Sequence, residues 1–171
     1  MTSARPHQAG VAHPHHIAVV GPGAADEQTC ELAAEVGRLV AARGAVVVCG
    51  GLGGVMDAAA RGAAESGGTS LGILPGHDRR DAGPHLTLAV ATGLGEMRNG
   101  LLVRDSDAVI AVGCSWGTLS EIALGVRQGI PVVVIGGWSV LDANGVAVPG
   151  PVPASSPARA VELAFAALAR R

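Results

Sequence analysis

The 171-residue sequence contains no lysine and no tyrosine, and both absences restrict its chemistry. All twelve basic residues are arginine, so a P-loop lysine, a Schiff-base lysine and a lysine general base are excluded. The aromatic residues are few: Trp116, Trp138 and Phe165. The formal net charge is −2, and no basic run is present. Without a positive stripe or a stacking platform, the sequence argues against nucleic acid as a partner.

Cysteine is also scarce, and long apolar runs are missing. Three scattered cysteines form no CxxC motif, which is typical of a reducing cytoplasm and not of a disulfide framework. No apolar run approaches the ~20 residues of a membrane span. Residues 1–16 are polar and contain no signal-peptide core. We therefore expect a cytoplasmic protein with no membrane segment. The histidines of residues 1–16 have no cysteine or carboxylate to complete a metal site, so no metal ion is predicted.

Short apolar runs alternate with amphipathic or small-residue segments from residue 16 onward. Strands are predicted at 16–21, 45–49, 69–74, 86–90, 108–112 and 130–135. Helices are predicted at 26–43, 55–66, 96–105, 117–128 and 158–171, and a turn at 142–145. Apolar strands separated by helices are typical of a parallel sheet that is covered on both faces. We predict an α/β fold, with a single-domain, doubly wound, mainly parallel Rossmann-like sheet over residues 16–171 and a flexible tail at 1–15.

Three glycine-containing loops each follow a predicted strand and precede a predicted helix. In such sheets ligands bind beyond the carboxyl ends of the strands, where the strand order reverses. Glycine lets a ligand approach the backbone closely, and a helix N-terminus offers free N–H groups. Phosphate is therefore the expected ligand. None of the loops forms GxGxxG with an acidic ribose ligand, which argues against a dehydrogenase-type dinucleotide site. The candidate binding residues are Gly21, Gly23, Gly50, Gly51, Gly53, Gly54, Ser115, Trp116, Gly117 and Thr118.

Two of these loops carry recognisable motifs. Residues 50–56, Gly-Gly-Leu-Gly-Gly-Val-Met, resemble the GGxxGxM element of the LOG-like (lysine decarboxylase-like, SLOG) Rossmann-fold superfamily. Residues 113–121, Gly-Cys-Ser-Trp-Gly-Thr-Leu-Ser-Glu, resemble its second signature, and their WGTLSE part is most similar to the molybdenum cofactor carrier-like branch. The superfamily also includes cytokinin riboside 5′-monophosphate phosphoribohydrolases. The resemblance covers residues 17–135, adds Met56 to the binding candidates and implies a homo-oligomer, a dimer or a tetramer.

The resemblance also implies roles for single residues. The hydrolases carry a catalytic arginine and a catalytic glutamate at the positions of Arg98 and Glu121. Gly117 and Thr118 would hold a 5′-phosphate, and Glu121, expected in the first helical turn, would hold ribose hydroxyls and stabilise a sugar cation. Arg98 offers a charged fork for a phosphate or a departing base. The alternative for Thr118 and Glu121 is a capping box that only stabilises the start of the helix.

Two functions remain open. Residues 113–116 depart from the Pro-Gly-Gly of the hydrolases, and Asn99 stands where those enzymes commonly have lysine. These departures favour binding of a phosphorylated nucleotide-like or pterin-like ligand, as in a molybdenum cofactor carrier. On this reading the fold requires no cofactor, and the bound molecule is a nucleotide, phosphate or the molybdenum cofactor. The alternative is a nucleoside 5′-monophosphate phosphoribohydrolase that cleaves the N-glycosidic bond to free base and ribose 5-phosphate.

Overall fold

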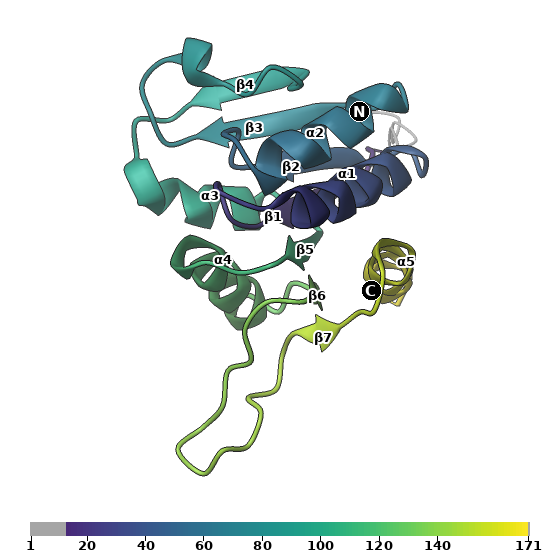
Figure 1. Cartoon of the computed structure of the whole chain (residues 1–171), viewed down its shortest axis with the longest axis vertical. Coiled ribbons are helices and arrows are strands. Elements are labelled where there is room, and N and C mark those ends of the chain that lie inside the picture. Colours follow the sequence, from purple (N-terminus) through teal and green to yellow (C-terminus); the bar gives the residue numbers. More distant parts are fainter. Residues whose placement is uncertain (1–12, 171) are drawn as a thin grey trace, which may run out of the picture.

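The computed structural model describes residues 13–170 and builds them around one seven-stranded sheet (Figure 1). The strands are β1 (His16–Val20), β2 (Val46–Cys49), β3 (Ser70–Leu74), β4 (Leu88–Ala91), β5 (Ala108–Val112), β6 (Val132–Ile135) and β7 (Val152–Pro153). All neighbouring strands are parallel, in the order β4-β3-β2-β1-β5-β6-β7. The chain builds outward from β1 to β4 and then returns to the other side of β1. The strand order therefore reverses between β1 and β5, which confirms the predicted doubly wound α/β fold.

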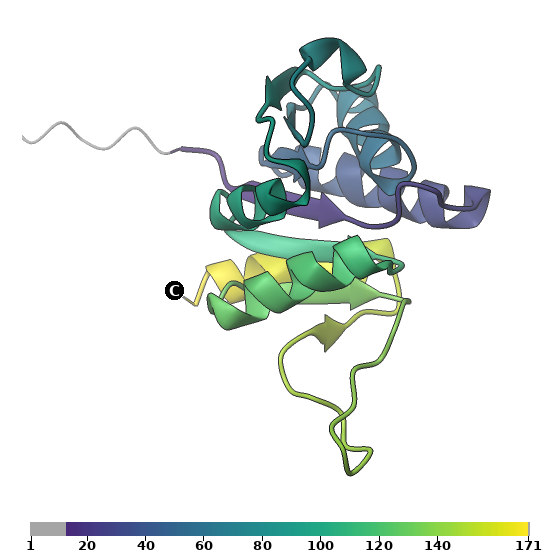
Figure 2. The ribbon, with the colours of Figure 1, turned by 90° about the vertical axis from the view of Figure 1, so that its left-hand side faces the viewer.

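Five α-helices cover the two faces of the sheet. They are α1 (Glu27–Ala41), α2 (Val55–Glu65), α3 (Asn99–Arg104), α4 (Trp116–Arg127) and α5 (Pro157–Leu168), with short 3-10 helices η1 (Arg79–Asp81) and η2 (Gly95–Arg98). Helices α3 and α4 lie on one face, and α1, α2 and α5 lie on the other (Figure 2).

The strands bury both faces because alternate side chains point to opposite sides. In β1, Ile17 and Val19 join the cluster under α1, α2 and α5, whereas Ala18 and Val20 join the cluster under α3 and α4. This arrangement explains why the strand sequences are apolar throughout instead of alternating.

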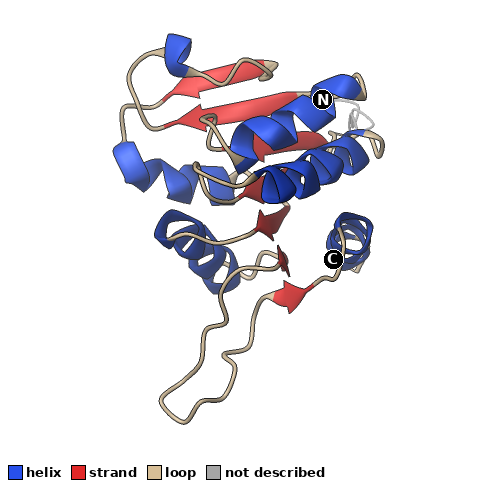
Figure 3. Ribbon diagram, viewed as in Figure 1, coloured by secondary structure: helices blue, strands red, loops and turns tan. Residues whose placement is uncertain are grey.

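The regions that differ from prediction are short or irregular. The predicted helix at 96–105 is a 3-10 turn that continues into the six-residue α3. Strand β7 was not predicted, because its two residues lie in a proline-rich segment that lacks a strand pattern. Residues 136–151 form an arm that leaves the body of the molecule (Figure 3), and its tip is the predicted turn, closed by the Gly145 N–H donating to the Asp142 carbonyl at 3.0 Å.

The remaining predictions concern the ends of the chain and membranes. Most of the predicted tail at 1–15 lies outside the described residues, and His15, which is described, contacts Asp107 with its ring nitrogen at 3.2 Å. Within residues 13–170, no helix has the length and apolar character needed to cross a membrane.

Candidate functional site

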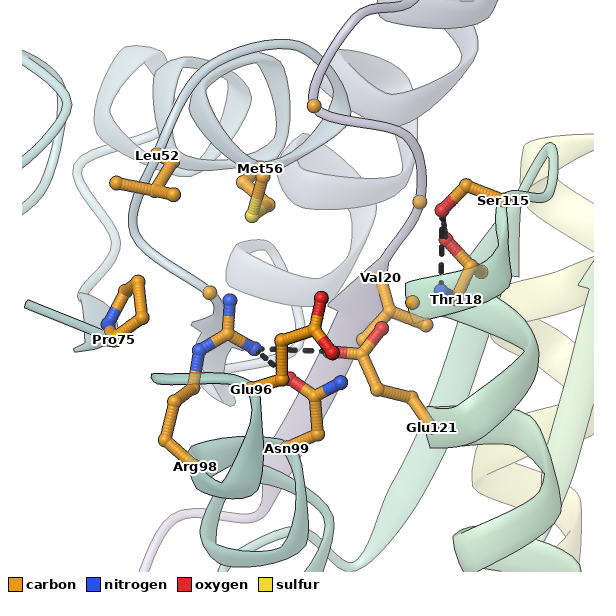
Figure 4. A pocket seen from close by; sticks show the side chains of 14 residues that line it. Val20, Leu52, Met56, Pro75, Glu96, Arg98, Asn99, Ser115, Thr118 and Glu121 are labelled. Carbon is orange, nitrogen blue, oxygen red and sulfur yellow. Dashed lines mark hydrogen bonds and ion pairs between the residues drawn. The ribbon is translucent and has the colours of Figure 1, made fainter. Parts of the chain in front are cut away.

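A cavity of about 230 Å³ lies at the carboxyl ends of the central strands, beside the point where the strand order reverses. Its walls come from the loops after β1, β2, β3 and β5, together with the starts of α2 and α4, η2 and α3 (Figure 4). The structure places both predicted catalytic residues, Arg98 and Glu121, on these walls. The predicted binding residues that line the cavity are Gly21, Gly23, Gly50, Met56, Ser115, Gly117 and Thr118.

The start of α4 forms one end of the cavity. Ser115 has an extended backbone and is the N-cap: its Oγ accepts from the Thr118 N–H at 3.2 Å and lies 3.0 Å from the Thr118 Oγ1. The capping-box reading of Thr118 and Glu121 is therefore wrong, because the helix begins at Trp116, one residue earlier than predicted. Glu121 consequently lies in the second turn of α4, not in the first.

This helix start has free donors. In the described residues, the backbone N–H groups of Trp116 and Gly117 have no hydrogen-bond partner. Unpaired N–H groups and the partial positive charge of a helix N-terminus favour an anion. The geometry of this end therefore fits a phosphate or another small anionic group.

An ion pair forms the middle of the cavity. The Arg98 Nη1 donates to the Glu121 Oε1 at 3.2 Å and also to the Asn99 Oδ1. Asn99 Nδ2 donates to the Ser120 Oγ at 2.9 Å, and that hydroxyl donates to the Gly117 carbonyl at 2.7 Å. A chain of hydrogen bonds thus connects the guanidinium group to the start of α4.

Burial controls the protonation of this pair. Arg98 is 8% and Glu121 is 6% exposed. Loss of solvent raises the pKa of the Glu121 carboxyl to about 7, although the charge and the hydrogen bond of Arg98 act to lower it. Near neutral pH the carboxyl group can therefore exchange a proton, as a general acid or base must.

The third part of the cavity is apolar. Leu52, Met56 and Pro75 lie together across the cavity from Ser115 and Thr118 (Figure 4). Val20 closes the floor, and the exposed Glu96 stands on the wall next to Arg98. The cavity therefore has an anion-binding end, a charged middle and an apolar wall.

Sequence reasoning missed five of the lining residues: Val20, Leu52, Pro75, Glu96 and Asn99. Pro75 was detectable, since it follows a predicted strand on the ligand-binding edge of the sheet. The sequence gives no such signal for Glu96, and it singles out Asn99 only as a departure from the lysine of the hydrolases.

Four predicted binding residues do not line the cavity: Gly51, Gly53, Gly54 and Trp116. Gly54 is the N-cap of α2 with φ +62°, and a Cβ there would lie 2.4 Å from the Pro22 carbonyl oxygen, so this glycine lets two ligand loops touch. A Cβ on Gly51 would lie 2.7 Å from the Leu74 side chain, whereas a Cβ on Gly53 would meet only the Gly23 carbonyl oxygen, at 3.6 Å.

Trp116 points away from the cavity. Its side chain is 79% exposed and packs edge-on against Trp138, with 4.9 Å between the ring centroids. The cavity also contains no histidine or cysteine. In the described part of the chain, no group of three or more His, Cys, Asp or Glu side chains is placed to hold a metal ion.

Burial raises the pKa of the thiol of Cys49, which precedes the loop 50–54, to about 11, and this favours the protonated thiol near neutral pH.

The model of the SLOG cluster4 family matches residues 14–152, a range that contains every residue of the cavity. The chain belongs to the SLOG cluster4 family. This result confirms the resemblance drawn from residues 50–56 and 113–121.

Solved structures similar to this SLOG cluster4 protein include two molybdenum cofactor proteins. The molybdenum cofactor binding protein of the phototrophic bacterium Rippkaea orientalis is 33% identical with a TM-score of 0.81, covering 92% of this chain and 99% of that chain. The Moco carrier protein of Chlamydomonas reinhardtii is 33% identical with a TM-score of 0.80, covering 93% and 100%. An uncharacterised protein of Archaeoglobus fulgidus is 42% identical over 133 residues, which is 74% of this chain and 87% of that protein.

Proposed function

We propose that this protein binds a phosphorylated pterin and acts as a molybdenum cofactor carrier. The observation that supports this proposal is the three-part cavity, in a chain that is 33% identical over 92% of its length to a molybdenum cofactor binding protein. A phosphorylated pterin has one anionic end and one flat ring, and the cavity offers a partner to each.

The phosphate would lie at the start of α4. There Gly117 and Thr118 line the cavity, and in the described residues the N–H groups of Trp116 and Gly117 have no hydrogen-bond partner. Gly21 and Gly23 line the cavity near this end. A Cβ on Gly23 would meet only the Met56 Cε, at 3.5 Å, whereas a Cβ on Gly21 would lie 2.4 Å from the Val112 carbonyl oxygen, so Gly21 lets the loop after β1 pack against β5.

The ring would lie against Leu52, Met56 and Pro75, because apolar side chains favour a flat ring that leaves water. The cavity of about 230 Å³ is smaller than the ~300–1,000 Å³ of common ligand pockets, so part of the ligand stays outside it. No cavity residue is a histidine or a cysteine, so this chain would hold the organic frame of the cargo and not its metal.

The test is direct binding of molybdenum cofactor released from a molybdoenzyme, with bound pterin measured by fluorescence after oxidation and bound molybdenum by mass spectrometry. Thr118→Val keeps the shape of a side chain that is 1% exposed and removes its hydroxyl. We expect roughly tenfold weaker binding from the loss of one hydrogen bond to a charged group. Ser139→Ala, on the exposed arm, is the matched control and should bind as the wild type does. Failure of the wild-type protein to retain pterin would refute the proposal.

A second function is favoured by the Arg98–Glu121 pair. A carboxyl group with a pKa near 7, placed 3.2 Å from a guanidinium and near Glu96, suits acid–base work on an N-glycosidic bond. The chain would then hydrolyse a nucleoside 5′-monophosphate to free base and ribose 5-phosphate.

Incubation with a panel of nucleoside 5′-monophosphates, followed by chromatography of the bases, tests this second function. If the wild-type protein releases free base and the Glu121→Gln variant does not, the result would support hydrolysis. Pterin binding without any release of base would leave the carrier function alone.

We also propose that the protein is a cytoplasmic homo-oligomer, a dimer or a tetramer, as the family resemblance implies. All three cysteines are free, which accords with a reducing compartment.

A further inference from the structure

Toward the described residues, the guanidinium group of Arg98 forms hydrogen bonds through only one of its three nitrogens. Its Nη1 donates to Asn99 and Glu121, but neither its buried Nε nor its Nη2 has a partner among residues 13–170. The whole side chain is only 9% exposed. An unpaired donor on a charged, buried group is costly, and such atoms are normally satisfied by a ligand or by water.

The free edge faces the apolar part of the cavity. A Cβ on Gly50 would lie 2.4 Å from the Arg98 Nη2 and 2.6 Å from the Met56 Sδ, so both groups border the same small space. Figure 4 shows the guanidinium between the wall of Leu52, Met56 and Pro75 on one side and Glu121 on the other. A ring held by that wall would therefore present its edge to the free donors.

We propose that Arg98 makes the cavity selective for rings whose edge carries hydrogen-bond acceptors, such as 4-oxopterins and 6-oxopurines, over 6-aminopurines. This inference rests on the proposed binding function. Arginine has five N–H donors and no acceptor. The Nη2 donors can pair with a ring oxo group such as the O6 of guanine, whereas the amino group of adenine would place donor against donor.

Neighbouring side chains fix the direction of this edge. The Asn99 carbonyl and the Glu121 carboxylate hold the Nη1, and Ser120 holds Asn99 from α4. The free side of the guanidinium is thus kept toward the ring, and Asn99 acts as a positioning residue.

The test compares inosine 5′-monophosphate with adenosine 5′-monophosphate, which carry an oxo and an amino group at position 6 of the ring and differ also at N1, a donor in the first and an acceptor in the second. Dissociation constants of the full-length protein are measured by calorimetry. We expect the wild type to bind the oxo compound at least about tenfold more tightly. Arg98→Gln should reduce this preference to about twofold, because an amide can turn either a donor or an acceptor toward the ring.

Two further variants make the result specific. Arg98→Lys retains donors but lacks the planar fork, and it should keep the sign of the preference at a reduced size. Arg127→Gln, on the exposed end of α4, makes the same change in charge away from the cavity and should keep the full preference. Circular dichroism of each variant shows whether it is folded.

The outcomes distinguish the ring selectivity inferred for Arg98 from the proposed binding function. Equal binding of both nucleotides, a preference for the amino compound, or a preference that survives in Arg98→Gln would overturn the inference and leave the binding function standing. Binding of neither nucleotide nor a phosphorylated pterin would overturn both.

Discussion

Burial raises the pKa of the Glu121 carboxyl to about 7, against 4.5 for a glutamate in solution. The folded protein therefore holds the proton more tightly than the unfolded chain does. This group's contribution to stability is complete below the unfolded pKa of 4.5 and is lost as the pH rises through about 7.

Glu121→Gln should remove that part of the pH dependence, because the amide stays neutral. Between about pH 5 and about pH 8 we expect the free energy of unfolding to fall less in the variant than in the wild type, by at most about 3 kcal/mol. Urea unfolding of both proteins at the two pH values measures the difference. Parallel pH dependence in the two proteins would show that the carboxyl is ionised throughout this range.

Because Gly50 has no side chain, the ends of the Arg98 and Met56 side chains can occupy the space beside it. A Cβ at this position would lie 2.4 Å from the Arg98 Nη2 and 2.6 Å from the Met56 Sδ, so Gly50→Ala must displace both ends. We expect roughly tenfold weaker ligand binding, with little loss of stability because both side chains can move. Gly53→Ala is the control, since its Cβ would meet only a carbonyl oxygen at 3.6 Å. Equal affinity in both variants, measured by calorimetry, would show that the position of Arg98 is not critical.

Helices α1 and α2 touch through their backbones. A Cβ on Gly62 would lie 1.9 Å from the Ala34 carbonyl oxygen, and one on Gly37 would lie 2.0 Å from that of Ala59. Two glycines on facing helices therefore permit a close crossing that any larger residue prevents. This crossing holds α2, and with it the loop 50–54, against the rest of the sheet.

Gly62→Ala should destabilise the protein by about 1–3 kcal/mol, although alanine favours a helix by up to ~1 kcal/mol over glycine. The reason is that the methyl group meets backbone, which cannot rotate away. Gly100→Ala, in α3, has no atom within 4 Å of its new methyl group and should be neutral or stabilising. Denaturant midpoints of the two variants compare these effects. A stable Gly62→Ala protein would mean that the two helices can move apart at little cost.

Long apolar segments made most of the fold predictable. Most of the longer elements lie within about two residues of their predicted bounds, because burial on both faces of the sheet leaves a clear apolar pattern. These elements are the strands β1, β2, β3, β5 and β6 and the helices α1, α2, α4 and α5. This apolar pattern is absent where an element is short and its segment is rich in proline, as at β7, and where a 3-10 turn leads into α3.

The site was predicted only in part, for a different reason. The glycine loops are predicted from their place between a strand and a helix, and Arg98 and Glu121 from the family resemblance. The structure brings Arg98, Glu121 and seven of the eleven binding candidates to one cavity. The role of Asn99 depends on a contact with Ser120, 21 residues away in sequence, and no local pattern reveals it. The cap of α4 was misassigned because Ser115 and Thr118 both have suitable hydroxyls, and only the backbone conformation decides between them.

The sheet as a whole has one face that its own helices cover incompletely. Leu88 and Val90 of β4 pair with Leu71 and Ile73, which belong to the cluster under α3 and α4, so all four side chains point to that face. Leu88 is nevertheless 58% exposed and Val90 is 48% exposed. Parallel sheets are normally covered on both sides, so an uncovered apolar strand calls for a partner.

A second copy of the chain offers a suitable partner, because Met97 and Leu101 expose an apolar face on η2 and α3, the two helices that follow β4 in the chain. In a two-fold dimer this face of each copy would cover β4 of the other, beside the wall of the cavity that carries Glu96. We therefore expect the wild type to sediment as a dimer or a larger oligomer.

The double variant Met97→Glu with Leu101→Glu should sediment as a folded monomer, since a charge buried without a partner opposes association. Val146→Glu, on the arm, puts a charge at a position that is 62% exposed and should leave the oligomer intact. A monomeric wild type would rule out a second copy as the cover of β4. If Val146→Glu dissociates the oligomer and the double variant does not, the contact runs through the arm, and β4 needs another partner.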